Sequence, residues 1–186
     1  MKWTFIICIT ISIIVLTSLI VIYYQMQVMG KQMSSSDNSE KWMERMYMEN
    51  NIYESIRNND CVLIVPNVAK ERPLLVCYYS CLSCGTCVNF AMNKIDEYFL
   101  DSESNPQIIF IASDFNEKTN FKRRNTMRLS SRNMEIPINE STAVCYFILQ
   151  NDSVRHFFIP EKAFENYTDI YLKGIKKKFF EIKQIK

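Results

Sequence analysis

This chain has very few glycines and a single histidine. Its 186 residues include three glycines and one histidine. No glycine-rich loop is therefore present to bind phosphate, and no Ser-His-Asp set is present for hydrolysis. The chain has one cysteine-rich segment, and a zinc site would need a second Cys-x-x-Cys elsewhere or a His-x-x-x-His pair; the sequence has neither. The net charge of +2, without basic residues interleaved with aromatic ones, gives no indication of nucleic acid binding.

The composition is that of a folded protein. A hydrophobic content of 48% and an aromatic content of 13% exclude a disordered chain. Behind the leading segment there is room for one domain of roughly 120–130 residues. Seven cysteines are too few and too unevenly placed for a small scaffold held together by disulfides, and their odd number leaves at least one thiol unpaired.

The leading segment is predicted to be an uncleaved signal anchor over residues 1–30, with a membrane helix at about 5–24. The run from Phe5 to Tyr24 contains no charge and no proline. A helix of twenty residues spans roughly 30 Å, the thickness of the hydrocarbon layer. The run is longer than the ~7–15 residues of a signal peptide core, and no Ala-x-Ala cleavage site follows it. We therefore expect the rest of the chain to lie outside the cytoplasm.

Residues 31–59 are predicted to form a spacer and a stalk helix. Residues 31–39 are polar, and residues 40–57 have apolar side chains near a 3.6-residue period. This stripe consists of Trp42, Met46, Tyr53 and Ile56. It indicates a helix that packs on the domain; a stripe that binds a partner or a second copy is the alternative.

Residues 60–186 are predicted to form one α/β domain. Apolar runs predict strands at 61–65, 74–79, 107–112, 142–149 and 154–159. Helices are expected after the cysteines, over residues 116–132, either as one helix or as a helix plus a loop, and over residues 161–185. The resulting order, β-β-α-β-α-β-β-α, predicts a parallel crossover unit completed by an antiparallel hairpin.

Three cysteines at a fixed interval, Cys81, Cys84 and Cys87, lie between the second expected strand and the helix that follows. A thiol at the start of a helix lies near unpaired N–H groups and the positive end of the helix dipole, and both favour the reactive thiolate. Because the helical apolar pattern begins at Val88, Cys84 is expected near the N-cap and Cys87 one turn further on. We therefore favour the pair Cys84/Cys87 over Cys81/Cys84.

The segment Leu74–Tyr79, the sequence Cys84-Gly85-Thr86-Cys87 and the helix after it resemble the thioredoxin fold. With its membrane anchor, the chain is similar to tethered thioredoxin-like thiol–disulfide proteins of the bacterial cell envelope. The resemblance covers roughly two-thirds of the chain. It implies a thioredoxin-like central sheet on the periplasmic side of the inner membrane, no cofactor, and protein thiols or disulfides as partners. It also implies that Cys84 is the exposed attacking thiol and Cys87 the buried resolving thiol.

The chain departs from this family at two points. The family carries a cis-proline just before the strand expected at 142–149, whereas this chain reads Ile138-Asn139-Glu140-Ser141 there, with Pro137 several residues too early. Cys81 is an additional cysteine, which is either a third redox thiol, a spare ligand or a small residue at the end of a strand. The cysteines in apolar segments are expected to be packing residues, and the role of Cys61 stays open. These packing residues are Cys8, Cys77 and Cys145.

Two alternatives to an enzyme remain. The first is a non-catalytic thioredoxin-fold module that binds a protein partner or copper; for copper, the lone histidine, His156, could join Cys84 and Cys87 as a ligand. The same cysteines could form a static structural disulfide. Asp114, after the third expected strand, is interpreted as a solvated loop carboxylate, with help in proton transfer as the alternative.

Overall fold

The structure is a computed structural model. It describes residues 2–66, 71–116, 119, 125–130, 137 and 142–181, with side chains described for the same residues except 2–14 and 26–37. The chain divides into two compact units, Met1–Tyr47 and Met48–Lys186.

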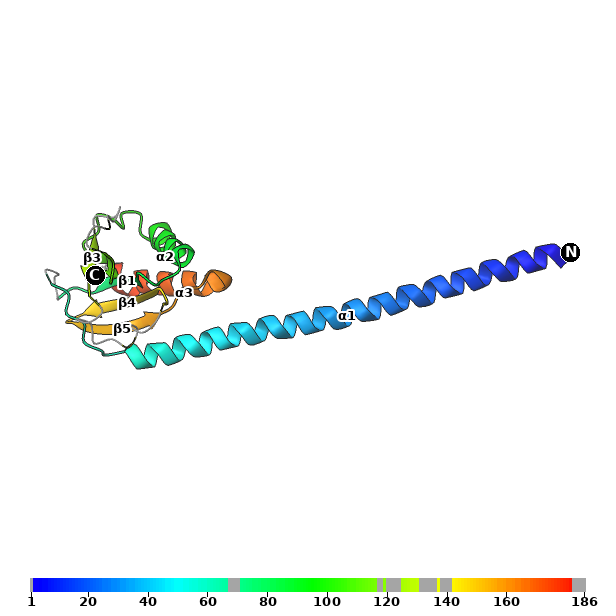
Figure 1. Cartoon of the computed structure of the whole chain (residues 1–186), viewed down its shortest axis with the longest axis horizontal. Helices are drawn as coiled ribbons and strands as arrows, with labels where there is room; N and C mark the ends of the chain where they lie inside the picture. Colours follow the sequence, from blue (N-terminus) through cyan, green and yellow to red (C-terminus); the bar gives the residue numbers. More distant parts are fainter. Residues whose placement is uncertain are drawn as a thin grey trace, which may run out of the picture. The chain divides into compact units, whose positions relative to one another are not determined.

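The first helix, α1, runs over Lys2–Asn58 and therefore includes the run predicted to be a membrane span (Figure 1). Of that run, residues 5–14 have side chains outside the described set. Within the part of the chain that the structure describes, no helix is both long enough and apolar enough to cross a bilayer.

The end of α1, from Met48 on, belongs to the second unit and is held there by polar side chains. Asn51 is buried, its side-chain oxygen accepts a hydrogen bond from the Ile159 N–H at 2.7 Å, and its amide group donates to the Ile159 carbonyl at 3.5 Å. Two residues of the predicted stripe, Tyr53 and Ile56, are instead 62% and 75% exposed. The prediction that they pack on the domain was wrong, because hydrogen bonding of Asn51 places the opposite side of the helix against the sheet end.

A five-stranded mixed sheet forms the centre of the second unit. Its strands are β1 (Leu74–Ser80), β2 (Ile108–Ser113), β3 (Thr126–Leu129), β4 (Cys145–Gln150) and β5 (Ser153–Phe158). Their order is β3-β2-β1-β4-β5. Strands β1, β2 and β3 are parallel, and β4 runs antiparallel to both β1 and β5. The prediction of an α/β fold with a parallel crossover and an antiparallel hairpin is confirmed at this level.

Helices α2 (Gly85–Tyr98) and α3 (Glu165–Ile175) lie beside the sheet and pack on each other (Figure 1). The Tyr146 hydroxyl, from β4, donates to the Ala91 carbonyl of α2 at 2.6 Å. The ring of Tyr171, from α3, stacks on Tyr146 and Phe158, with centroids 5.9 and 4.6 Å apart. A short 3₁₀ turn (Lys162–Phe164) precedes α3, and a π turn (Lys176–Phe180) follows it.

An apolar cluster covers one face of the sheet. Because successive side chains of a strand point to opposite faces, this cluster takes every second residue of β1, β2 and β4. Its largest members by strand are Tyr78, Ile111 and Phe147, all fully buried. Leu63 and Val65 complete it from the segment before β1. Side chains on both faces of the sheet are therefore buried, including every residue of β1 up to its end at Ser80.

Two expected elements differ from the structure. Residues 61–65 were predicted to be a strand but make only an isolated bridge, Val62 to Ser153. Residues 116–132 were predicted to be helical, whereas Thr126–Leu129 pairs with β2 as β3; most of the remaining residues there lie outside the described part. A further expectation, the absence of a cis-proline before β4, concerns residues 138–141, which also lie outside it. The peptide bonds that are described include no cis bond.

Candidate functional site

The cysteine segment begins with a tight turn at the end of β1. The Ser83 N–H donates to the Ser80 carbonyl at 3.0 Å, and the Ser83 hydroxyl accepts from the Ser80 N–H at 3.0 Å. The Cys81 N–H donates to the carbonyl of Ser113, the last residue of β2, also at 3.0 Å. These bonds hold the turn at the carboxyl ends of the parallel strands, the edge at which α/β sheets place their ligands.

Cys84 is the N-cap residue of α2. Its backbone is extended, with φ −60° and ψ 123°, and its carbonyl accepts the Val88 N–H at 2.9 Å. Its sulfur accepts the Cys87 N–H at 3.4 Å and lies 2.9 Å from the Thr86 hydroxyl oxygen. A cap residue normally uses an oxygen to accept the unpaired N–H groups of the first turn. Here a sulfur accepts them, as the sequence predicted for a cysteine at this place.

The two thiols of the pair differ in acidity. Hydrogen bonds from the Cys87 side chain, from the Thr86 hydroxyl and from the Cys87 N–H lower the pKa of Cys84 to about 7. The hydrogen bond to Cys84, followed by burial, raises the pKa of Cys87. Cys84 is therefore the member of the pair that is a thiolate near neutral pH, which is the form that attacks a disulfide.

All three cysteines of the segment are exposed, unbridged thiols: Cys81, Cys84 and Cys87. The expected burial of Cys87 was wrong. Cys87 lies in the first turn of α2, and the buried residues of this helix begin only at Ala91. Both sulfurs of the pair are thus open to a macromolecular partner.

The other cysteines are placed largely as packing residues. Cys77 and Cys145 lie within β1 and β4 and are fully buried. Burial raises the pKa of Cys145 well above its ordinary value, so this thiol stays protonated. Cys61 is half-buried, and its sulfur lies 3.6 Å from the Arg57 carbonyl. The side chain of Cys8 lies outside the described residues.

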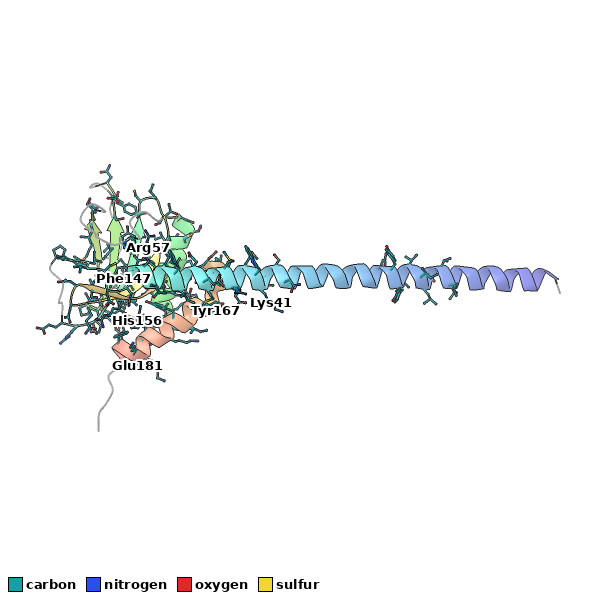
Figure 2. The ribbon with its side chains drawn as sticks, turned by 90° about the horizontal axis from the view of Figure 1, so that it is seen from below. Lys41, Arg57, Phe147, His156, Tyr167 and Glu181 are labelled. Atoms are coloured by element: carbon teal, nitrogen blue, oxygen red, sulfur yellow. The ribbon has the colours of Figure 1, made fainter. Side chains whose placement is uncertain are left out.

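His156, labelled in Figure 2, is not brought to the cysteines. It lies in β5, and β4 separates β5 from β1, so two strand spacings of about 4.8 Å each lie between them. Its Nε2 atom is 3.1 Å from the Lys178 ammonium. Burial first, and then the charges of Lys178 and Arg155, lower the pKa of His156. The geometry gives no support to a joint copper site with Cys84 and Cys87.

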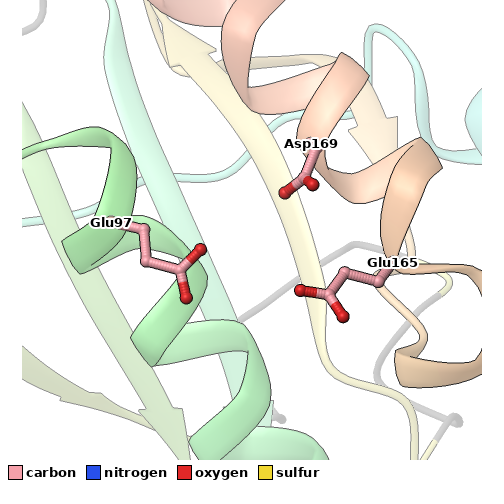
Figure 3. A group of neighbouring side chains, drawn as sticks. All are labelled: Glu97, Glu165 and Asp169. Atoms are coloured by element: carbon pink, nitrogen blue, oxygen red, sulfur yellow. The ribbon is translucent and has the colours of Figure 1, made fainter.

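Three carboxylates, one from α2 and two from α3, surround the Lys94 ammonium between the two helices. This cluster was not predicted from the sequence. Its members are Glu97, Glu165 and Asp169, whose nearest oxygens lie within 4.8 Å of one another (Figure 3). The buried ammonium of Lys94 bonds to Glu97 at 2.9 Å, to Asp169 at 3.0 Å, and to Glu165. Helical spacings of three and four residues, Lys94 to Glu97 and Glu165 to Asp169, were the signal for it. Since Lys94 supplies the cation, we interpret the cluster as an ion-pair centre between helices.

Asp114 lies at the end of β2 and is exposed, with φ 58°. It borders an open depression of about 670 Å³ that Phe115, Arg128 and Ser130 also line. Its exposure agrees with the interpretation as a solvated loop carboxylate.

The described residues thus define a mixed α/β domain that carries an exposed dithiol at the start of a helix. Compared with models of protein families and with curated proteins, the sequence matches none of them. The function of this domain is therefore inferred from the geometry of the dithiol.

Proposed function

We propose that the chain is a membrane-tethered, thioredoxin-like thiol–disulfide oxidoreductase that acts on proteins outside the cytoplasm through Cys84 and Cys87. One observation carries the proposal: the Cys84 sulfur is the N-cap of α2, exposed and hydrogen-bonded by the Cys87 N–H. The thioredoxin-like fold is part of the proposal and is supported by the resemblance around the cysteines. The tether and the periplasmic location are supported by the uncharged run at residues 5–24.

The reaction consists of two exchanges. The Cys84 thiolate attacks one sulfur of a partner disulfide, a Cys84–partner bond forms, and the second partner sulfur leaves as a thiolate. The Cys87 thiol then loses its proton to solvent, and its sulfur attacks Cys84. The Cys84–Cys87 disulfide forms and the first partner sulfur leaves. The partner gains two electrons, which the dithiol loses; the reverse sequence oxidises a partner dithiol.

Trapping experiments on the full chain test the proposal. We expect Cys84→Ser to abolish insulin reduction and the capture of mixed disulfides. Cys87→Ser should instead accumulate mixed disulfides at Cys84, because the second exchange is removed. Cys61→Ser is the control, because it lies outside the segment and should leave both assays unchanged. Equal behaviour of wild type and Cys84→Ser would refute the enzymatic proposal.

Two further variants and the reduction potential of the pair assign Cys81 and separate the alternatives. Loss of turnover in Cys81→Ser would make Cys81 an additional redox thiol, and unchanged turnover would make it a residue of the turn. Copper retained after purification and lost in His156→Gln would favour the metal-binding module. A pair that stays oxidised at a very low potential, without exchange, would favour a structural disulfide.

A further inference from the structure

Thr86 stands beside the attacking sulfur without a packing reason for being there. It is the second residue of α2 and is exposed. Threonine is a poorer helix former than alanine or the unbranched residues. Its hydroxyl oxygen lies 2.9 Å from the Cys84 sulfur. The side chain of Thr86 is therefore not part of the core, and the structure gives it a contact with the Cys84 sulfur.

The direction of this hydrogen bond depends on the state of Cys84. A protonated Cys84 can either donate to the Thr86 oxygen or accept from it. The thiolate has no proton and only accepts, so the Thr86 hydroxyl must then donate. A hydrogen bond to an ionised acceptor is about twice as strong as a neutral one. The contact is therefore stronger for the thiolate than for the thiol.

The same bond distinguishes the two redox states. In a Cys84–Cys87 disulfide the Cys84 sulfur carries no charge and is a weak acceptor. Reduction adds two electrons; one proton goes to Cys87, and above pH 7 the negative charge stays on Cys84. Because Thr86 interacts more strongly with the charged sulfur, it stabilises the reduced form relative to the disulfide.

We propose that Thr86 is a positioning residue that holds Cys84 as the attacking thiolate and thereby sets the balance between the dithiol and the disulfide. This inference rests on the proposed redox function of Cys84 and Cys87. It adds the residue that regulates how readily the pair gives up its electrons. The lowered pKa of Cys84, of which the Thr86 hydroxyl is the second largest cause, agrees with it.

The test compares Thr86→Val, which removes the hydroxyl and keeps the shape, with Thr86→Ser, which keeps the hydroxyl. In the reduced full chain, the rate of Cys84 alkylation by iodoacetamide is followed against pH by peptide mass spectrometry. We expect Thr86→Val to lower the thiolate fraction below neutral pH up to about tenfold, one unit of pKa. We expect Thr86→Ser to match the wild type.

The reduction potential of the pair, measured in glutathione buffers, gives the second readout. In buffers at about pH 9, where Cys84 is ionised in both proteins, a tenfold loss of stabilisation of the thiolate makes the potential of Thr86→Val about 30 mV more negative. Thr86→Ser should restore it. An unchanged pH profile and potential in Thr86→Val would overturn the inference, and so would a serine variant that behaves like valine.

Failure of the inference is distinguishable from failure of the proposed function. If wild type and Thr86→Val reduce insulin equally and share one pH profile, the redox function stands and the role of Thr86 is refuted. If the wild type shows no exchange, the function fails. The alkylation profiles then still decide whether Thr86 stabilises the thiolate.

Discussion

At the scale of the residue, the molecule depends on one sulfur in the place of a capping oxygen. Serine, threonine, aspartate and asparagine are the usual N-cap residues. Cys84 takes this position with a larger, more polarisable atom and accepts the Cys87 N–H at 3.4 Å. The N-terminal end of a helix favours negative charge, so the cap and the thiolate stabilise each other.

The pH dependence of alkylation tests this arrangement. A free cysteine ionises at about pH 8.5, whereas the pKa of Cys84 is lowered to about 7. The rate at Cys84 should therefore rise through pH 7 and level off about one and a half units above it. In urea the same peptide should show a midpoint near 8.5. One common midpoint for the folded and unfolded chain would contradict the hydrogen-bonded thiolate.

The sequence predicted the place of Cys84 but not the surroundings of its neighbours. The onset of the apolar pattern at Val88 was enough to set the N-cap at Cys84. The exposure of Cys87 depends on where the first turn of α2 lies against the sheet, and that is a tertiary property. The contact of Thr86 with Cys84 depends on a side-chain rotamer, which sequence spacing does not specify.

At the scale of the element, Lys94 holds α2 and α3 together. Burial lowers the pKa of Lys94, but the hydrogen bonds that its ammonium donates to Glu165, Glu97 and Asp169 together raise it by more. The ammonium therefore stays charged at every physiological pH. Removal of it would leave three carboxylates facing one another across the two helices.

We expect Lys94→Met to lower the free energy of unfolding by about 1.5–3 kcal/mol, the range for hydrogen bonds to charged groups. Urea unfolding at pH 7 measures it. Lys177→Met is the matched control, because Lys177 is exposed and surface substitutions usually change stability by less than about 0.5 kcal/mol. Equal losses in the two variants would show that Lys94 does not join the helices.

The same cluster predicts a pH dependence of stability. Burial raises the pKa of Asp169, but the hydrogen bonds from Lys94 and Tyr98 together with the charge of Lys94 lower it by more. The unfolded chain then binds more protons than the folded one, so this stabilisation is present above about pH 4. It is lost as the pH falls through the folded value. Lys94→Met should show a smaller loss than the wild type in that range.

Strands with strong apolar runs were predictable, and strands defined by pairing were not. The expected segments at 74–79 and 107–112 agree with β1 and β2 to within one residue at each end. The hairpin turn was visible in its asparagine and aspartate, since Asn151 and Asp152 both have positive φ. By contrast, β3 has four residues and is a strand only because β2 offers hydrogen bonds to it. The segment 61–65 has a strand-like alternation but lacks a ladder.

At the scale of the whole molecule, the attachment of the chain to a membrane can be tested directly. The sequence predicts a tether in residues 1–30. We expect deletion of these residues to move the protein from a carbonate-washed membrane fraction to the soluble fraction. Leu16→Arg should weaken insertion, since a charge at the centre of a span costs about 2.5–3.5 kcal/mol. Ser35→Arg, in the polar spacer, should not. A full chain found in the soluble fraction would refute the tether.

The position of Cys84 at the head of α2 has a consequence for the helix itself. When the sulfur enters a disulfide, it gives up its charge and most of its capacity to accept the Cys87 amide. Reduction of the disulfide would then stabilise the first turn of α2, and oxidation would destabilise it. Under the proposed exchange, a partner that docks against this first turn would meet a different surface before and after the reaction, and that difference would favour its release.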